Sequence, residues 1–182
     1  MKVSREQVSE HRARILAAAA RLFRLRGFDE VTVAEVMKDA GLTHGAFYGH
    51  FSSKQALIAE AVGQALTPAV QDKARLSVAA YADGYLSRGH RDDRGSSCAF
   101  SSLGTEAARG SADLRRLMTQ SVRRQIDRFS AEMKGKTPHE KRRAAIAAWS
   151  ALVGAMVLAR IVDDDTLSEE ILTETRASLP LA

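Results

Sequence analysis

The chain has 182 residues, a formal net charge of +5 and a single cysteine. This length is enough to bury a hydrophobic core, and one cysteine cannot form an internal disulfide, so we expect a protein of a reducing, cytoplasmic setting. The basic excess suggests a polyanionic partner without establishing one. Residues 1–20 lack the apolar core of a signal peptide, and the longest uncharged run, residues 144–159, is shorter than the roughly 20 residues that cross a bilayer. The sequence therefore predicts neither secretion nor a membrane partner.

Helical signals begin near the N-terminus. Apolar residues recur at helical spacing from Ile15 to Phe23, and Gly27 supplies a helix stop. Thr32 stands three residues before Glu35, which is the spacing of a capping box, and a short apolar stripe follows it. The pattern predicts a long first helix and a short second one.

A glycine-containing turn follows the second helix. Gly41 ends that helix, Thr43 can cap a third helix, and Ser52 or Ser53 can cap a fourth. Two short helices joined by a tight turn are typical of the helix-turn-helix arrangement.

The rest of the chain also reads as helical, because no strand-like alternation is present. Pro68 should kink or end the fourth helix, and the segment 88–97 reads as a polar loop. Thr137 and Pro138 resemble the N-cap and first position of a helix, and the acidic segment 163–170 should separate that helix from the last one. The further predicted helices cover residues 72–87, 98–109, 112–133, 138–162 and 169–179.

The predicted third helix has an unusual polar face. His44, Gly45 and Tyr48 share this face and Gly49 adjoins it, while two phenylalanines can pack on the other side. Each glycine in a helix costs about 0.5 to 1 kcal/mol relative to alanine. Two explanations remain open: the small residues let the backbone approach the edges of DNA bases, or the glycines allow close packing against another helix.

The segment from Ile15 to Val62 resembles the DNA-binding domain of TetR-family transcriptional regulators. The resemblance rests on the "GF" after the first helix, "TVAEV" in the second, the "AGLT" turn, "FYGHF", and the spacing of Lys54 and Leu57. It implies an all-α protein with an N-terminal three-helix helix-turn-helix domain, residues 1–53, and a C-terminal helical ligand-binding and dimerisation domain, residues 54–182. It also implies a homodimer that binds a palindromic operator in double-stranded DNA and is released by a small ligand.

The resemblance also assigns residues to the DNA surface. Phosphate contacts are implied for Thr32, Thr43, Tyr48, His50 and Lys54, and contacts to base edges for His44, Gly45 and Ala46, with Gly49 in the same surface. Many relatives have lysine or arginine where this chain has His44. We therefore expect base readout here to depend more on pH or on DNA shape.

The helix expected from residue 138 is apolar on two sides, which favours two neighbours. We expect it to pack, with the last helix, against the same pair of helices from a second chain. The alternative is the central helix of a monomer. The residues expected at the dimer interface are Trp149, Leu152, Val153, Met156, Val157, Ile171 and Leu172.

The central helices offer a possible lining for a ligand pocket, although each of these residues also suits an ordinary core. The candidate lining residues are Tyr81, Tyr85, Cys98, Phe100, Leu103, Leu117, Met118 and Phe129. Their character favours an apolar or aromatic effector. Cys98 lies near arginines at an expected helix start, where a thiolate is favoured, but a lone cysteine also serves as a small packed hydrophobe.

Motifs of catalysis are absent from the sequence. It contains no G-x-S-x-G, no H-E-x-x-H and no glycine-rich phosphate loop, and its five histidines lack metal-ligand spacing. We therefore expect no enzyme activity, no cofactor and no metal. A helical adaptor that uses the helix-turn-helix for protein contacts stays open as an alternative, and a repressor rather than an activator is implied only by the resemblance.

Overall fold

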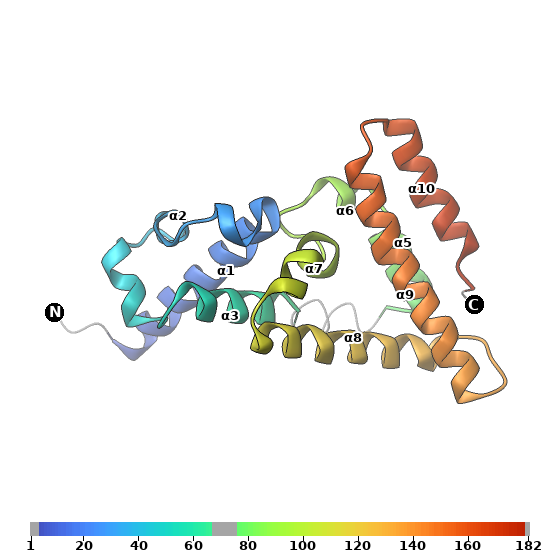
Figure 1. Cartoon of the computed structure of the whole chain (residues 1–182), viewed down its shortest axis with the longest axis horizontal. Helices are drawn as coiled ribbons and strands as arrows, with labels where there is room; N and C mark the ends of the chain where they lie inside the picture. The colour runs from blue at the N-terminus through green and yellow to red at the C-terminus, as the bar shows by residue number, and fades with distance from the viewer. Residues whose placement is uncertain (1–3, 67–75, 181–182) are drawn as a thin grey trace.

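The computed structural model describes residues 4–66 and 76–180, and all of its regular elements in these ranges are helices. The elements are α1 (Arg5–Glu30), α2 (Val33–Asp39), the 3₁₀ helix η1 (His44–Gly49), α3 (Lys54–Leu66), α5 (Val78–Tyr85), α6 (Arg88–Asp92), α7 (Ala99–Arg109), α8 (Ala112–Glu132), α9 (Pro138–Ile161) and α10 (Asp165–Ser178). Figure 1 shows α1, α2, η1 and α3 at one end of the molecule and the hairpin of α9 and α10 at the other. The predicted all-α fold is confirmed.

The start of the chain folds as the capping signals predict. Thr32 and Glu35 form a reciprocal capping box at the start of α2. Gly27 interrupts α1 with a φ of 82° and a ψ of 174°, and Gly41 follows α2 with a φ of 68°. Both glycines adopt backbone angles that residues with a side chain rarely adopt, so both act as the predicted stops.

The predicted third helix is a 3₁₀ helix of six residues. Thr43 occupies its N-cap position but makes no side-chain capping bond. Packing on its buried side holds this element in place, because Phe47 and Phe51 are buried and stack with ring centroids 5.7 Å apart. Ser53 then caps the next helix, α3, by accepting a hydrogen bond from the Ala56 N–H at 3.1 Å.

Two hydrophobic clusters form the interior. The first joins α1, α2, η1, α3 and α7 with the start of α8, and the second joins α5, the end of α8, α9 and α10. Trp149 lies in the second cluster with the rings of Tyr85, Phe100 and Phe129 at centroid distances of 5.7, 5.7 and 5.8 Å. Phe100, on α7, packs against both clusters. The domain boundary expected at residue 53 stays a prediction, and α3, just beyond it, packs on α1.

Three predicted segments differ from the structure. Residues 88–97 were expected to form a loop, but Ser87 caps the short helix α6 there. The helix expected from residue 72 begins at Val78, because Ser77 caps it; Pro68 and residues 72–75 lie outside the described residues. The acidic segment starts the last helix instead of preceding it, because Asp164 caps α10 and acidic residues suit a helix N-terminus.

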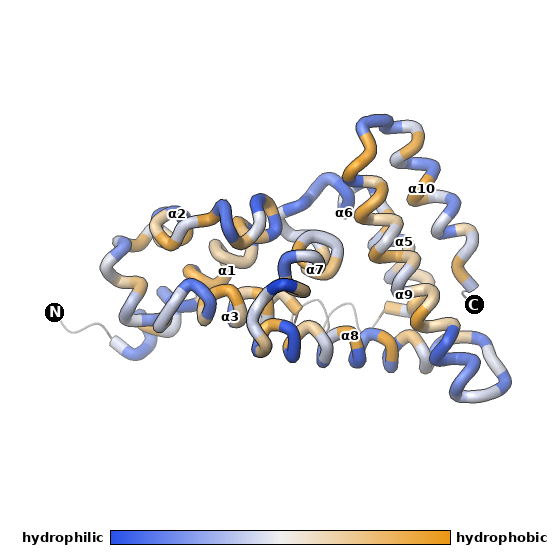
Figure 2. Tube along the Cα trace, viewed as in Figure 1, coloured by the Kyte–Doolittle hydropathy of each residue, from blue (hydrophilic) through white to orange (hydrophobic). Residues whose placement is uncertain are grey.

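The helix α9 is apolar along most of its length, as Figure 2 shows. By length and composition alone it could cross a bilayer, but one of its sides packs against α8 and α10 in the second cluster. The predicted dimer interface needs correction, because the protein buries four of those residues in its own core: Trp149, Leu152, Met156 and Leu172. The large apolar side chains that α9 leaves exposed are Ile146, Leu158 and Ile161.

The conformation of Gly27 generates a first prediction. Substitution of Gly27 by alanine should lower the free energy of unfolding by about 2 kcal/mol, because its φ and ψ lie in a region that costs other residues about 1 to 3 kcal/mol. The new Cβ would also collide with Oε1 of Glu106 and displace that carboxylate. Urea unfolding measures the difference.

The matched control is Gly104→Ala. Gly104 lies inside α7, where an added Cβ meets nothing within 4 Å, so alanine should raise the free energy of unfolding by about 0.5 to 1 kcal/mol. A Gly27→Ala variant as stable as the wild type would contradict the role of Gly27 as the break in α1.

Candidate functional site

One side of η1 forms an exposed strip of five residues: Thr43, His44, Gly45, Tyr48 and Gly49. Tyr48 is 72 % exposed, more than any other large hydrophobic side chain that the structure describes. Its ring lies edge-on to the buried Phe47 at 5.3 Å and near His44 at 6.4 Å. The buried phenylalanine therefore supports a strip whose polar and aromatic groups face solvent.

The two glycines of this strip are not needed for packing within the chain. A Cβ added at Gly45 or Gly49 would meet nothing within 4 Å, and neither residue has a positive φ. The alternative that these glycines allow close packing against another helix is therefore wrong for this chain's own helices. The glycines instead leave the backbone of η1 open to solvent.

The two threonines near η1 differ in their availability. The Thr32 hydroxyl donates to Oε2 of Glu35 at 2.8 Å and accepts from the Glu35 N–H at 3.2 Å, so its proton is already used. Hydrogen bonds from the Thr32 backbone, Arg26 and the Thr32 side chain lower the pKa of Glu35 to about 2. The Thr43 hydroxyl makes no capping bond. Of the two threonine hydroxyls predicted to contact phosphate, that of Thr43 is the freer.

His50 and Lys54 border the strip. Burial, followed by the nearby His11 and Arg12, lowers the pKa of His50, so its imidazole is neutral at neutral pH. Its Nδ1 is buried without a hydrogen-bond partner among the described residues. Lys54 is half-buried at the first position of α3. His50 thus offers a hydrogen bond without charge, while Lys54 carries a positive charge at the edge of the strip.

A second site is a cavity of about 80 Å³ in the other half of the protein. Four of the predicted ligand residues line it: Tyr81, Tyr85, Cys98 and Phe100. The other four, Leu103, Leu117, Met118 and Phe129, lie outside its lining. Leu103 and Phe129 are instead fully buried in the first and second clusters, respectively.

Several lining residues were not predicted. Trp149 lines the cavity from α9, although the sequence placed it at a dimer interface. Ser121 and Gln125 line it from α8 and lie in register with the buried Leu114 and Phe129 of that helix. The sequence signal that could have identified them is the presence of two polar residues on an otherwise apolar face of α8. The remaining lining residues are Ala65, Leu66, His90, Ser96, Ser97 and Ala99.

Two polar groups of the cavity lack a well-aligned hydrogen bond among the described residues, the Tyr85 hydroxyl and the Gln125 Nε2. Burial and the adjacent Cys98 raise the pKa of Tyr85 well above its usual value, so the phenol stays neutral. Cys98 and Ser101 lie within interaction range of that hydroxyl without aligning to satisfy it. The cavity thus combines aromatic walls with a hydroxyl and an amide N–H that a bound molecule can satisfy.

His90 connects the cavity wall to the start of α7. Its Nε2 accepts a hydrogen bond from the Cys98 N–H at 3.1 Å, which leaves Nδ1 as the donor to the Tyr85 carbonyl at 2.6 Å. The ring thereby caps the first free N–H at the start of α7. Among the described residues, no group of three or more His, Cys, Asp or Glu side chains is placed to hold a metal ion.

Comparison with known proteins identifies the part that contains η1. Residues 15–61 match the family described as "Bacterial regulatory proteins, tetR family". The chain is 47 % identical over 53 residues to the uncharacterized HTH-type transcriptional regulator YdgC of Bacillus subtilis, and 42 % identical over 55 residues to the HTH-type transcriptional regulator TtgR of Pseudomonas putida. These matches cover 29 % and 30 % of this chain, and 27 % and 26 % of those proteins, so the chain spans about a quarter of the curated relatives it matches.

Solved structures match over nearly the whole chain. The reduced form of NemR from Escherichia coli superposes with a TM-score of 0.70 at 25 % identity, covering 94 % of this chain and 98 % of that one. A TetR-family regulator from Agrobacterium tumefaciens superposes with a TM-score of 0.77 at 18 % identity, covering 95 % and 99 %, and shows the shared fold. The two curated relatives and the Agrobacterium tumefaciens protein are named as transcriptional regulators. The N-terminal segment, residues 15–61, is thus similar to the tetR family of bacterial regulatory proteins, and the chain shares its fold with the reduced form of NemR.

Proposed function

We propose that the protein is a sequence-specific DNA-binding transcriptional regulator that acts as a repressor. In this proposal a homodimer binds a palindromic operator in the cytoplasm, and a small ligand releases it. The observation that carries the proposal is the open strip of η1: two glycines with no packing role beside the most exposed aromatic side chain that the structure describes. Neither glycine is needed for packing within the chain, so this surface is free to contact another molecule.

The strip has the shape and chemistry of a DNA-reading surface. The absent side chains of Gly45 and Gly49 let the backbone approach base edges in the major groove, where His44 can hydrogen-bond a base. The hydroxyls of Thr43 and Tyr48 and the ammonium of Lys54 suit phosphate oxygens. His50 and Ala46 border the same surface, and Thr32 contributes less, because Glu35 already accepts its hydroxyl proton.

A homodimer is supported by the exposed side of α9. Ile146, Leu158 and Ile161 are exposed, and a Cβ added at Gly154 would meet nothing within 4 Å, so a second helix can approach closely there. Val153, Val157 and the Ile171 side chain of α10 are half-buried and complete the proposed contact. Two recognition elements must lie roughly 34 to 36 Å apart to enter successive major grooves, which a dimer provides.

The ligand site of the proposal is the cavity of about 80 Å³. Its walls include the rings of Tyr81, Phe100 and Trp149, which favour an apolar or aromatic effector. The unsatisfied Tyr85 hydroxyl and Gln125 amide add a preference for an effector with a hydrogen-bond acceptor.

Selection of the purified protein on random duplex DNA tests the proposal. The wild type should enrich a palindrome, and Tyr48→Ala should weaken binding to all sequences about equally, because a phosphate contact carries no sequence information. His44→Ala should instead change the preferred sequence, because a base-edge contact distinguishes bases. Sequencing of the bound DNA measures both effects.

The adaptor alternative predicts a different outcome. Binding through phosphates weakens steeply as salt rises, whereas an apolar protein contact does not. Absence of any enriched DNA at low salt would contradict the regulator proposal and favour the adaptor. Identical sequence preferences for the wild type and His44→Ala would contradict the division between base and phosphate contacts.

The dimer has its own test in Ile161→Asp. A carboxylate at a position that is 70 % exposed in one chain should leave the fold intact but disfavour burial against a second chain. Light scattering after size exclusion should therefore show two chains for the wild type and one for Ile161→Asp. The control Val8→Asp, at a similarly apolar exposed position of α1, should stay dimeric; a monomeric wild type at micromolar concentration would contradict the proposal.

A further inference from the structure

One wall of the cavity is a continuous stretch of chain, residues 90–100, here called the wall segment. It runs from the C-terminal part of α6 to the first turn of α7. It contributes six of the lining residues: His90, Ser96, Ser97, Cys98, Ala99 and Phe100. The remaining lining residues belong to α3, α5, α8 and α9.

The size of the cavity requires a wall to move when an aromatic ligand binds. Its volume of about 80 Å³ is about half that of an engineered protein cavity of roughly 150 Å³ that holds benzene. The wall on α9 is fixed, because Trp149 packs against the rings of Tyr81, Tyr85 and Phe129, all outside the wall segment. Residues 93–98 of the wall segment lie between α6 and α7 and outside any regular helix, so we expect this wall to move.

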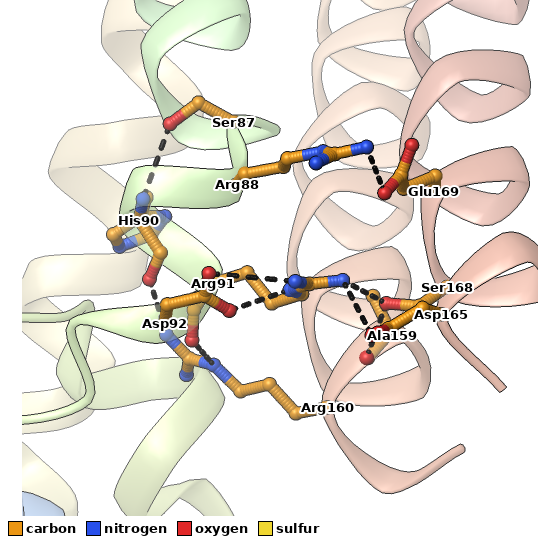
Figure 3. Close-up of polar contacts among 10 residues, drawn as sticks. All are labelled: Ser87, Arg88, His90, Arg91, Asp92, Ala159, Arg160, Asp165, Ser168 and Glu169. Atoms are coloured by element: carbon orange, nitrogen blue, oxygen red, sulfur yellow. Dashed lines mark hydrogen bonds and ion pairs between the residues drawn. The ribbon is translucent and has the colours of Figure 1, made fainter. Parts of the chain in front are cut away.

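The first end of the wall segment is held by the C-terminal helices, as Figure 3 shows. Arg160, on α9, donates to the carbonyl oxygens of His90 at 2.7 Å and Arg91 at 3.1 Å. Arg91 in turn donates to the Ser168 hydroxyl of α10 at 2.8 Å. This end of the wall segment should therefore move together with α9 and α10, which carry the proposed dimer contact.

The middle of the wall segment is held by the DNA-binding half of the molecule. Nε of Arg24, on α1, donates to the Gly95 carbonyl at 2.7 Å. Arg24 is half-buried, and this burial lowers its pKa, yet its hydrogen bond goes to a backbone carbonyl and not to a carboxylate. A second link follows along α7, where Oε2 of Glu106 accepts the Phe28 N–H at 2.6 Å beside the break in α1.

We propose that Arg24 is the residue that transmits filling of the cavity to the DNA-binding surface. A ligand larger than the cavity displaces the wall segment, Arg160 holds one end in place, and the shifting Gly95 carbonyl pulls on Arg24. Because α2 and α3 pack on α1, a shift of α1 reorients η1 relative to the second subunit. This inference rests on the proposed function, and Arg24 acts as a positioning residue that touches neither DNA nor ligand.

A double-mutant cycle on operator affinity tests the inference without a known ligand. Ser121→Phe places a ring in the cavity from α8 and stands in for a bound molecule, since Ser121 is buried and lines the cavity. Arg24→Met keeps the side-chain stem and removes the donor to Gly95. Ser121→Phe should weaken operator binding about tenfold in the wild type and less than about threefold in the Arg24→Met background.

The control is Arg26→Met, which removes the same charge from the same helix. Arg26 pairs with Glu35 and bonds the Glu30 carbonyl, without contact to the wall segment, so its effect and that of Ser121→Phe should be additive. Circular dichroism checks the fold of each variant, and Ser121→Leu replaces Ser121→Phe if the larger ring prevents folding.

Equal weakening by the cavity-filling substitution in the wild-type and Arg24→Met backgrounds would overturn the inference. So would a cavity-filling substitution that leaves operator affinity unchanged. A wild type that enriches no DNA in the selection experiment would instead overturn the proposed function, so the two failures are distinguishable.

Discussion

The packing of α7 between two hydrophobic clusters is the contact on which the rest of the structure depends. Ala99, Leu103 and Ala107 are buried in the first cluster, while Phe100 packs against both. The eleven-residue helix α7 thus packs both in the half that contains η1 and in the half that contains the cavity. Because closely packed interiors respond to small changes as units, a displacement at one end of α7 is felt at the other.

The candidate DNA surface has a well-packed buried side and an exposed side on which two residues are glycines. Phe47 and Phe51 fix η1 from the inside, and the two glycines contribute nothing to that packing. The stability of the element therefore resides on its buried side, and the exposed side is free to serve recognition. The same division explains why Tyr48 is held in place by an edge-on ring and yet remains open to solvent.

The sequence predicted features that depend on local chemistry and missed those that depend on tertiary contacts. Capping at Thr32 and Thr137 was readable, because each cap uses residues within one helical turn. The 3₁₀ geometry of η1 could not be predicted, because six residues are too few to separate a 3₁₀ period from an α-helical one, and α6 is also too short to show a period. A helix with two apolar sides does not reveal which side meets its own core, so Trp149 was assigned to the wrong neighbour. The untested DNA contacts stay predictions.

Trp149 is the only tryptophan of the chain and lies in the wall of the cavity, among the rings of Tyr85, Phe100 and Phe129. The emission of an indole depends on the polarity and packing of its surroundings, and an apolar site shifts that emission to shorter wavelength. The tryptophan fluorescence of the protein therefore originates at one place, beside the space that a ligand would fill. The molecule carries its own optical probe of that space, without any label.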